Sequence, residues 1–163
     1  MDDNQFVLGI HPTTRGFGWA LFESATSPFD WGSVEARGEK HKNTLARLGA
    51  LLERYQPAVL VMEQFEGEAS RRSRRIRRLA STMTALAKAR NIKVAIFTRA
   101  EIAAALSGSG GRTREEIAQF VANNVGALRD RLPAKRKIWE SERPNLALFS
   151  AAACALTWFA NKQ

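Results

Sequence analysis

Six arginines lie within eight consecutive residues, from 71 to 78, and form the densest charge in the chain. They are Arg71, Arg72, Arg74, Arg75, Arg77 and Arg78, and no acidic residue is interleaved among them. Because salt-bridged helix surfaces alternate the sign of their charges, this run differs from an ordinary solvated face. The planar guanidinium group binds phosphate through two parallel hydrogen bonds, so the run favours a phosphate-bearing partner.

Two further residues, His11 and Glu63, come directly after short apolar runs and carry groups capable of acid–base or metal chemistry. An unpaired buried carboxylate is costly, so Glu63 needs either a partner or an exposed strand end. His11 is one candidate partner, and a salt bridge between the two side chains would satisfy both. Alternatively, the imidazole acts as a general base, or as a ligand for Zn²⁺, Mn²⁺ or Ni²⁺. A purely local hydrogen-bonding role for His11 stays open as well.

The charge of the whole chain agrees with a polyanionic partner. Lys and Arg number 25 against 16 acidic residues, which gives a formal net charge of +9 over 163 residues. Such a balance favours nucleic acid, although a general solubility bias would produce the same sum. Hydrophobic residues make up 45% of the chain, enough for a packed core.

Several features bound the cellular context. The single cysteine, Cys154, cannot form an intramolecular disulfide and lies in an apolar run, which predicts a buried structural thiol. No basic N-terminal region precedes an apolar stretch, so no secretory signal is visible. The apolar run at 146–160 is short for a membrane span. We therefore expect a cytoplasmic protein without a membrane segment.

The elements that position these groups begin with three short strands, expected at 6–10, 18–23 and 29–36, and turns between them predict antiparallel pairing. Apolar residues at helical spacing then predict helices, and continuous apolar runs between them predict buried strands. The helices are expected at 43–55, 70–90, 99–106, from 114 onward and at 146–160, and the strands at 58–62 and 93–97.

Two helix starts carry a specific local signal. Thr98 is followed three residues later by Glu101, and Thr113 is followed in the same way by Glu116. This spacing is typical of a capping box, in which each side chain bonds the backbone N–H of the other residue. The order of elements predicts one α/β domain over 1–163, with a mixed five-stranded sheet and helices on both faces.

Three segments share the pattern of a known family. In residues 6–12 an apolar strand leads into Gly-Ile-His-Pro, and Gly18-Trp19 follows on the next strand. In residues 61–65 apolar residues lead into Glu-Gln, and residues 98–114 hold a helix start and a Gly-rich loop that opens another helix. In this order and spacing the segments resemble the RuvC-type Holliday junction resolvases, whose fold is RNase H-like. The resemblance covers about residues 6 to 160.

The resemblance implies a metal-dependent site that this chain has mostly lost. Such enzymes hold two divalent cations about 3.5–4 Å apart with a cluster of carboxylates. The family has one acid on the first strand, one at the end of the fourth, and two on the last helix. Here those positions are His11, Glu63, Ala147 and Ser150. A shifted register of the last helix would bring Asn145 or Glu142 closer.

The resemblance also implies which basic residues meet DNA. It places the Arg71–Arg78 run near the junction, and loop residues Arg15, Arg112 and Arg114 on the same face. A second basic patch at 135–137, Lys-Arg-Lys, lies beside Trp139, which is either a base-stacking residue or a half-buried anchor.

Three functions remain in competition. The first is a protein that binds branched or duplex DNA without efficient cleavage, since most metal-binding carboxylates are missing. The second is an active endonuclease whose rebuilt site uses His11, Glu63 and a residue such as Asn145 or Glu142, with Mg²⁺ or Mn²⁺ as cofactor. The third is an interaction module for an acidic protein. A homodimer is expected from the resemblance alone.

Overall fold

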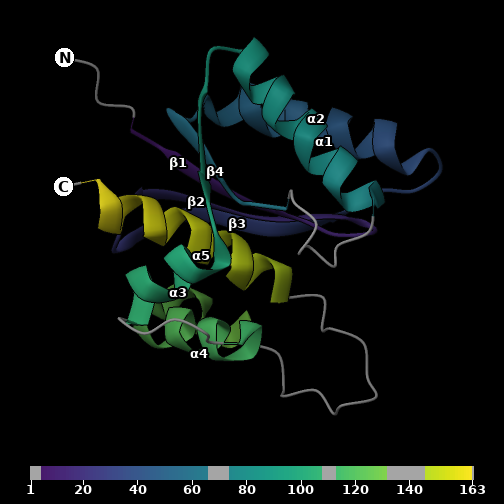
Figure 1. Ribbon diagram of the computed structural model, residues 1–163. Helices are drawn as coiled ribbons and strands as arrows, with labels where there is room; N and C mark the ends of the chain where they lie inside the picture. The colour runs from purple at the N-terminus through teal and green to yellow at the C-terminus, as the bar shows by residue number, and fades with distance from the viewer. Residues whose placement is uncertain (1–4, 66–73, 108–112, 132–145, 163) are drawn as a thin grey trace, which may run out of the picture.

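A five-stranded mixed sheet lies at the centre of the protein, with strand order β3-β2-β1-β4-β5 (Figure 1). The computed structural model describes residues 5–65, 74–107, 113–131 and 146–162. The strands are β1 (Val7–Pro12), β2 (Gly16–Ser24), β3 (Ser27–Glu35), β4 (Val59–Glu63) and β5 (Lys93–Phe97). β1, β2 and β3 pair antiparallel, and β4 pairs parallel with both β1 and β5. The predicted sheet is confirmed.

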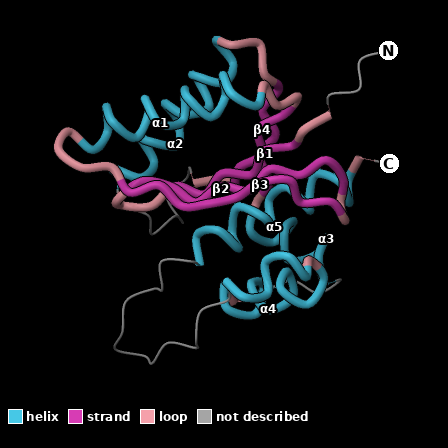
Figure 2. The backbone as a smooth tube through the Cα atoms, turned by 180° about the vertical axis from the view of Figure 1, so that it is seen from behind, coloured by secondary structure: helices cyan, strands magenta, loops and turns pink. Residues whose placement is uncertain are grey.

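Helices cover both faces of this sheet (Figures 1 and 2). On one face lie α1 (Lys40–Tyr55) and α2 (Arg74–Ala89). On the other lie α3 (Arg99–Ser107), α4 (Arg114–Asn124), a short 3₁₀ helix η1 (Gly126–Arg131) and α5 (Leu146–Asn161). Each face has its own apolar core, because side chains alternate between the two faces along every strand.

The first strand is longer than the sequence predicts, and this matters for the site. β1 continues past Ile10 to Pro12, so that His11 pairs with Gly18 inside the ladder. The turn that follows is closed by the Thr13 hydroxyl, which accepts hydrogen bonds from the backbone N–H groups of Arg15 and Gly16 at 3.2 and 3.0 Å. This local closure of the turn lets β2 start at Gly16 instead of Gly18.

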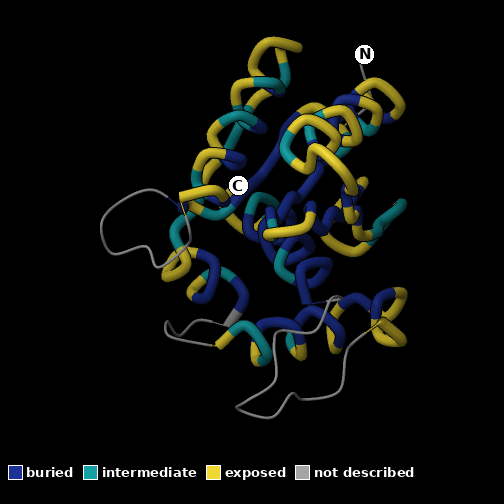
Figure 3. Tube along the Cα trace, turned by 90° about the vertical axis from the view of Figure 1, so that its right-hand side faces the viewer, coloured by how far each residue is buried: buried dark blue, intermediate teal, exposed yellow. Residues whose placement is uncertain are grey.

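The helix α5 packs directly on the sheet backbone. A Cβ atom at Gly9 would lie 1.9 Å from the carbonyl oxygen of Ala151, and one at Gly18 would lie 2.4 Å from the carbonyl carbon of Ala147. Most residues of α5 are buried. Figure 3 shows in dark blue that the buried residues gather in the interior of the molecule. The nearly all-apolar sequence of α5 is thus explained by core burial, and no helix within the described residues is long and apolar enough to cross a membrane.

Both predicted capping boxes are formed. The backbone N–H of Thr98 donates to Glu101 Oε1 at 2.8 Å, and the N–H of Glu101 donates to Thr98 Oγ1 at 3.1 Å. Thr113 and Glu116 make the same pair of bonds at 2.8 and 3.1 Å. The starts of α3 and α4 are therefore each stabilised by hydrogen bonds between two residues three positions apart. The prediction that Cys154 is a buried thiol is also confirmed.

Candidate active site and nucleic-acid interface

The carboxyl ends of β1 and β4 bring His11 and Glu63 to the same edge of the sheet. The two strands are parallel neighbours, with Ile10 paired to Met62, so each residue of interest follows directly after a paired residue. Ile10 and Met62 belong to the core under α1 and α2. Because side chains alternate, His11 and Glu63 both point to the opposite face, toward α5.

His11 is completely buried, with 0% of its surface exposed, and its partner comes from a helix far away in the sequence. Arg114 Nη1 lies 2.7 Å from His11 Nε2. Because a guanidinium group donates hydrogen bonds and cannot accept them, Nε2 must be the acceptor and the ring proton lies on Nδ1. The Phe65 ring packs edge-on against the imidazole, with centroids 5.6 Å apart.

Burial and two arginines keep the imidazole neutral. Desolvation lowers the pKa of His11 well below its ordinary value, and the positive charges of Arg114 and Arg99 lower it further. A salt bridge with Glu63 requires the imidazolium form, which these surroundings oppose. The expected His11–Glu63 ion pair is therefore corrected: His11 is a neutral acceptor for a guanidinium group.

A small pocket gathers the charged groups around Glu63. Its polar lining consists of Glu63, Arg99, Arg114 and Ser150, and its apolar lining consists of Ile102, Ile117 and Ala153. The space left between them suits about one water-sized group. Ser150, from the middle of α5, is thus brought beside the end of β4, at the pocket that also receives the arginines.

Cys154 lies one helical turn beyond Ser150 on α5 and interacts with Glu63. Burial raises the pKa of its thiol, and the negative charge of Glu63 raises it further. A hydrogen bond with the Glu63 backbone opposes this shift. The thiol is consequently protonated at neutral pH and is a structural neighbour of the site, in keeping with its burial.

These residues do not fit the two divalent cations that the resemblance implies. Hard cations such as Mg²⁺ need several oxygen ligands, and two-metal sites need carboxylates to hold both ions. Within the described ranges, no three His, Cys, Asp or Glu side chains gather as a metal site would require. The His11 Nε2 lone pair is already taken by Arg114, and two guanidinium groups line the pocket. A metal here would be repelled and under-coordinated.

The other positions on the last helix that the resemblance compares with acids do not line this pocket within the described residues. Ala147 packs its backbone against Gly18 and is buried. Asn145 and Glu142 lie outside the described residues, as does the basic patch at 135–137 with Trp139.

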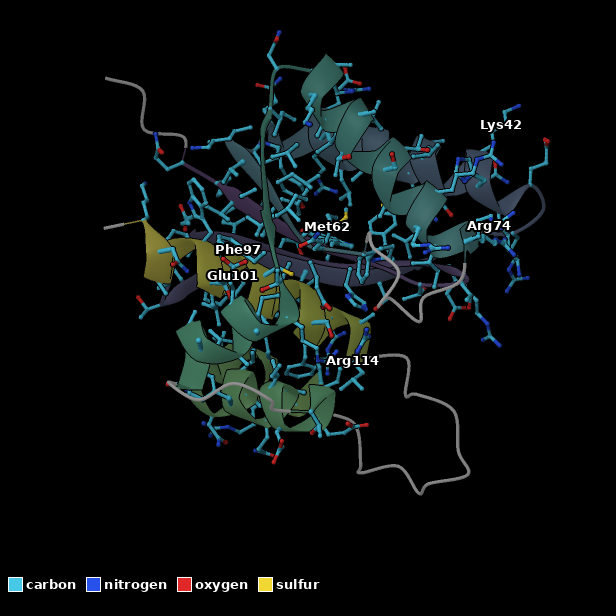
Figure 4. The ribbon with its side chains drawn as sticks, viewed as in Figure 1. Lys42, Met62, Arg74, Phe97, Glu101 and Arg114 are labelled. Atoms are coloured by element: carbon cyan, nitrogen blue, oxygen red, sulfur yellow. The ribbon has the colours of Figure 1, made fainter. Side chains whose placement is uncertain are left out.

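The arginines predicted to bind nucleic acid lie on two layers of the protein. Arg15, Arg74, Arg75 and Arg78 are exposed, whereas Arg71, Arg72 and Arg112 lie outside the described residues. Arg77 lines a larger groove between α2 and the ends of β4 and β5, together with Lys88, Gln64 and Glu63. Figure 4 shows Arg74 and Lys42 at the same end of the α1–α2 layer, with Arg114 on the α4 side of the sheet.

Arg99 is the site residue that sequence reasoning missed. It follows the capping residue Thr98 at the start of α3, in the order Thr-Arg-x-Glu. The same four-residue order begins α4 as Thr113-Arg114-Glu115-Glu116. The repeated pattern was a visible signal that two helices present an arginine in the same way.

The fold of this chain is similar to that of several solved structures. No protein-family model and no curated protein matches the sequence. The structure of Thermus thermophilus RuvC is similar with a TM-score of 0.71 and 20% identity, over 97% of this chain and 95% of that one. The chain has the RuvC fold.

Two complexes share this RuvC-like fold. T. thermophilus RuvC in complex with a Holliday junction substrate matches with a TM-score of 0.70 and 21% identity, over 94% of this chain and 92% of that one. Fowlpox virus resolvase in complex with Holliday junction DNA matches with a TM-score of 0.57 and 14% identity, over 94% and 97%. At these identities the likeness establishes the RuvC fold, and the residues of the site decide what chemistry is supported.

Proposed function

We propose that this chain is a RuvC-like nucleic-acid-binding protein that binds branched or duplex DNA without efficient cleavage. The observation that carries the proposal is the 2.7 Å contact of the Arg114 guanidinium group with the buried His11 imidazole. A cation of the protein itself thereby lies where the resemblance implies metal ions and carboxylates, which supports a lack of efficient cleavage. Proteins of the same fold, solved with Holliday junction DNA, support nucleic acid as the ligand.

Charge supports binding independently of the site. The net charge of +9 and the exposed arginines at the start of α2 supply groups that neutralise phosphates. A four-way junction and a linear duplex of matched length should both bind, and log affinity should fall linearly with log salt between 50 and 200 mM, with a slope of about −0.9 per neutralised phosphate. Fluorescence anisotropy of labelled DNA measures both quantities. Absence of binding at low salt would favour an acidic protein partner instead.

The second candidate, an active nuclease, rests on the shared pocket of Glu63 and Ser150. It is tested with radiolabelled junction DNA in Mg²⁺ or Mn²⁺, comparing the wild-type chain with a Glu63→Gln variant. We expect no strand cleavage above background from either protein, while both still bind the junction. Cleavage by the wild type that Glu63→Gln abolishes would establish the nuclease and overturn the proposed lack of cleavage.

A further inference from the structure

The first residue of α3 and the first residue of α4 are both arginines, and both line the same pocket. Arg99 and Arg114 are the first helical residues of α3 and α4, each directly after the threonine of a completed capping box. Both side chains line the pocket that holds Glu63 and Ser150. Because the capping boxes fix the direction in which each helix starts, the two guanidinium groups are held toward a common point.

This placement opposes the ordinary preference of helix ends. The N-terminus of a helix carries a partial positive charge, so a cation in the first turn is unfavourable and an anion is favourable. Two helices nevertheless begin with arginine beside the same pocket. The first turns also carry Glu101, Glu115 and Glu116, so the helix ends are already matched by acids. The groups that an anion entering the pocket would meet are the two guanidinium groups, which bind phosphate through paired hydrogen bonds.

The described residues that line the pocket carry more positive than negative groups. The neutral His11 accepts from Arg114 and brings no charge of its own. Among the described residues that line the pocket, Glu63 brings one carboxyl group against two guanidinium groups. The space suits one water-sized group, which matches one phosphate oxygen better than a pair of metal ions.

We propose that Arg99 and Arg114 form a metal-free phosphate site. In this site a backbone phosphate of the bound nucleic acid places one oxygen in the pocket and accepts hydrogen bonds from both guanidinium groups. The inference rests on the proposed DNA binding and specifies its chemistry: arginine takes the role that divalent cations have in metal-dependent nucleases. No bond is made or broken, so the phosphate is held and released intact.

The test compares DNA affinity of an Arg99→Gln, Arg114→Gln double variant with the wild type. We expect the double variant to bind junction and duplex about tenfold or more weakly. Its salt slope should be smaller in magnitude by about one, because one phosphate is no longer neutralised. Wild-type affinity should be the same in EDTA as in Mg²⁺. The matched control, Arg54→Gln with Arg129→Gln, removes the same charge at exposed positions and should keep the wild-type slope.

Two more variants separate binding from folding. Arg99 is exposed, so Arg99→Gln alone should unfold at the wild-type temperature and still weaken binding. Arg99→Lys with Arg114→Lys keeps both charges and should restore the salt slope more fully than the affinity, because lysine lacks the planar fork. If the wild type binds DNA and the Gln variants bind equally well, or if EDTA abolishes binding, the arginine site is wrong while the proposed function stands. If the wild type binds no DNA, both the arginine site and the proposed function are contradicted.

Discussion

At the scale of single residues, the decisive feature is a histidine whose pKa is lowered by burial and, further, by two nearby arginines. His11 has no exposed surface, and Arg114 donates to its Nε2 at 2.7 Å. Protonation of the ring would place two cations in contact away from water, so the folded state resists it. An aspartate at this position would instead form an ion pair with Arg114. The histidine at the position where the resemblance implies an acid is therefore matched to Arg114.

The neutral imidazole predicts a pH-dependent stability. Because burial, Arg114 and Arg99 lower the pKa of His11 below the ordinary 6.5, the unfolded chain binds a proton that the folded chain does not. The contribution of His11 is thus complete above about pH 6.5 and is lost as the pH falls below it, by up to about 1.4 kcal/mol per pH unit. Urea unfolding from pH 7.5 to 5 should show this slope in the wild type and lack it in His11→Gln. His41→Gln, at the other histidine, is the control. Equal slopes in all three proteins would contradict this account of His11.

At the scale of elements, contact between α5 and the sheet backbone positions the site. Gly9 on β1 allows the carbonyl of Ala151 to approach, and Gly18 on β2 does the same for Ala147. Ser150 lies between these two contact points on α5 and reaches the pocket only because the helix is so close. Any residue larger than glycine at either position has to push α5 outward.

Gly9→Ala should therefore destabilise the protein by about 3 kcal/mol or more, because its Cβ would lie 1.9 Å from a backbone oxygen that cannot rotate away. Gly126→Ala is the matched control, since a Cβ there meets nothing within 4 Å. The control should stay within about 0.5 kcal/mol of the wild type. Chemical denaturation measures both. A Gly9→Ala protein as stable as the control would show that α5 is not packed this closely.

At the scale of the whole molecule, positive charge lies on both helical layers at one end of the sheet. The parallel strands β1 and β4 run into the pocket region, and α2 begins after the carboxyl end of β4. Figure 4 shows Arg74 and Lys42 above the sheet and Arg114 below it. A duplex arm that reaches the pocket is therefore expected to meet the start of α2 as well.

This arrangement predicts that position matters more than total charge. A variant with Arg74, Arg75 and Arg78 changed to Gln should lose DNA affinity, and its salt slope should shrink by about three. Changing Arg54, Arg90 and Arg129 to Gln lowers the net charge of +9 by the same three units, at exposed positions outside the start of α2. This control should keep most of the slope. Equal losses in both triple variants would mean that binding follows net charge alone.

The sequence by itself determined the features that depend on near neighbours in the chain. Strand and helix order followed from apolar spacing, and the capping boxes at Thr98 and Thr113 followed from residues three positions apart. The length of β1 was underestimated because the side chain of Thr13, in the turn, and pairing with β2 extend it.

Only the tertiary structure decided the partners in the site. His11 and Arg114 are 103 residues apart, and Glu63, Arg99 and Ser150 come from three further elements. No local pattern encodes which of these side chains meet, because their meeting depends on how α3, α4 and α5 pack on the sheet. The sequence predicted, through the resemblance, that most metal-binding carboxylates are missing. The packed fold showed that a guanidinium group from α4 lies against His11, and a cation at that point changes what the site can bind.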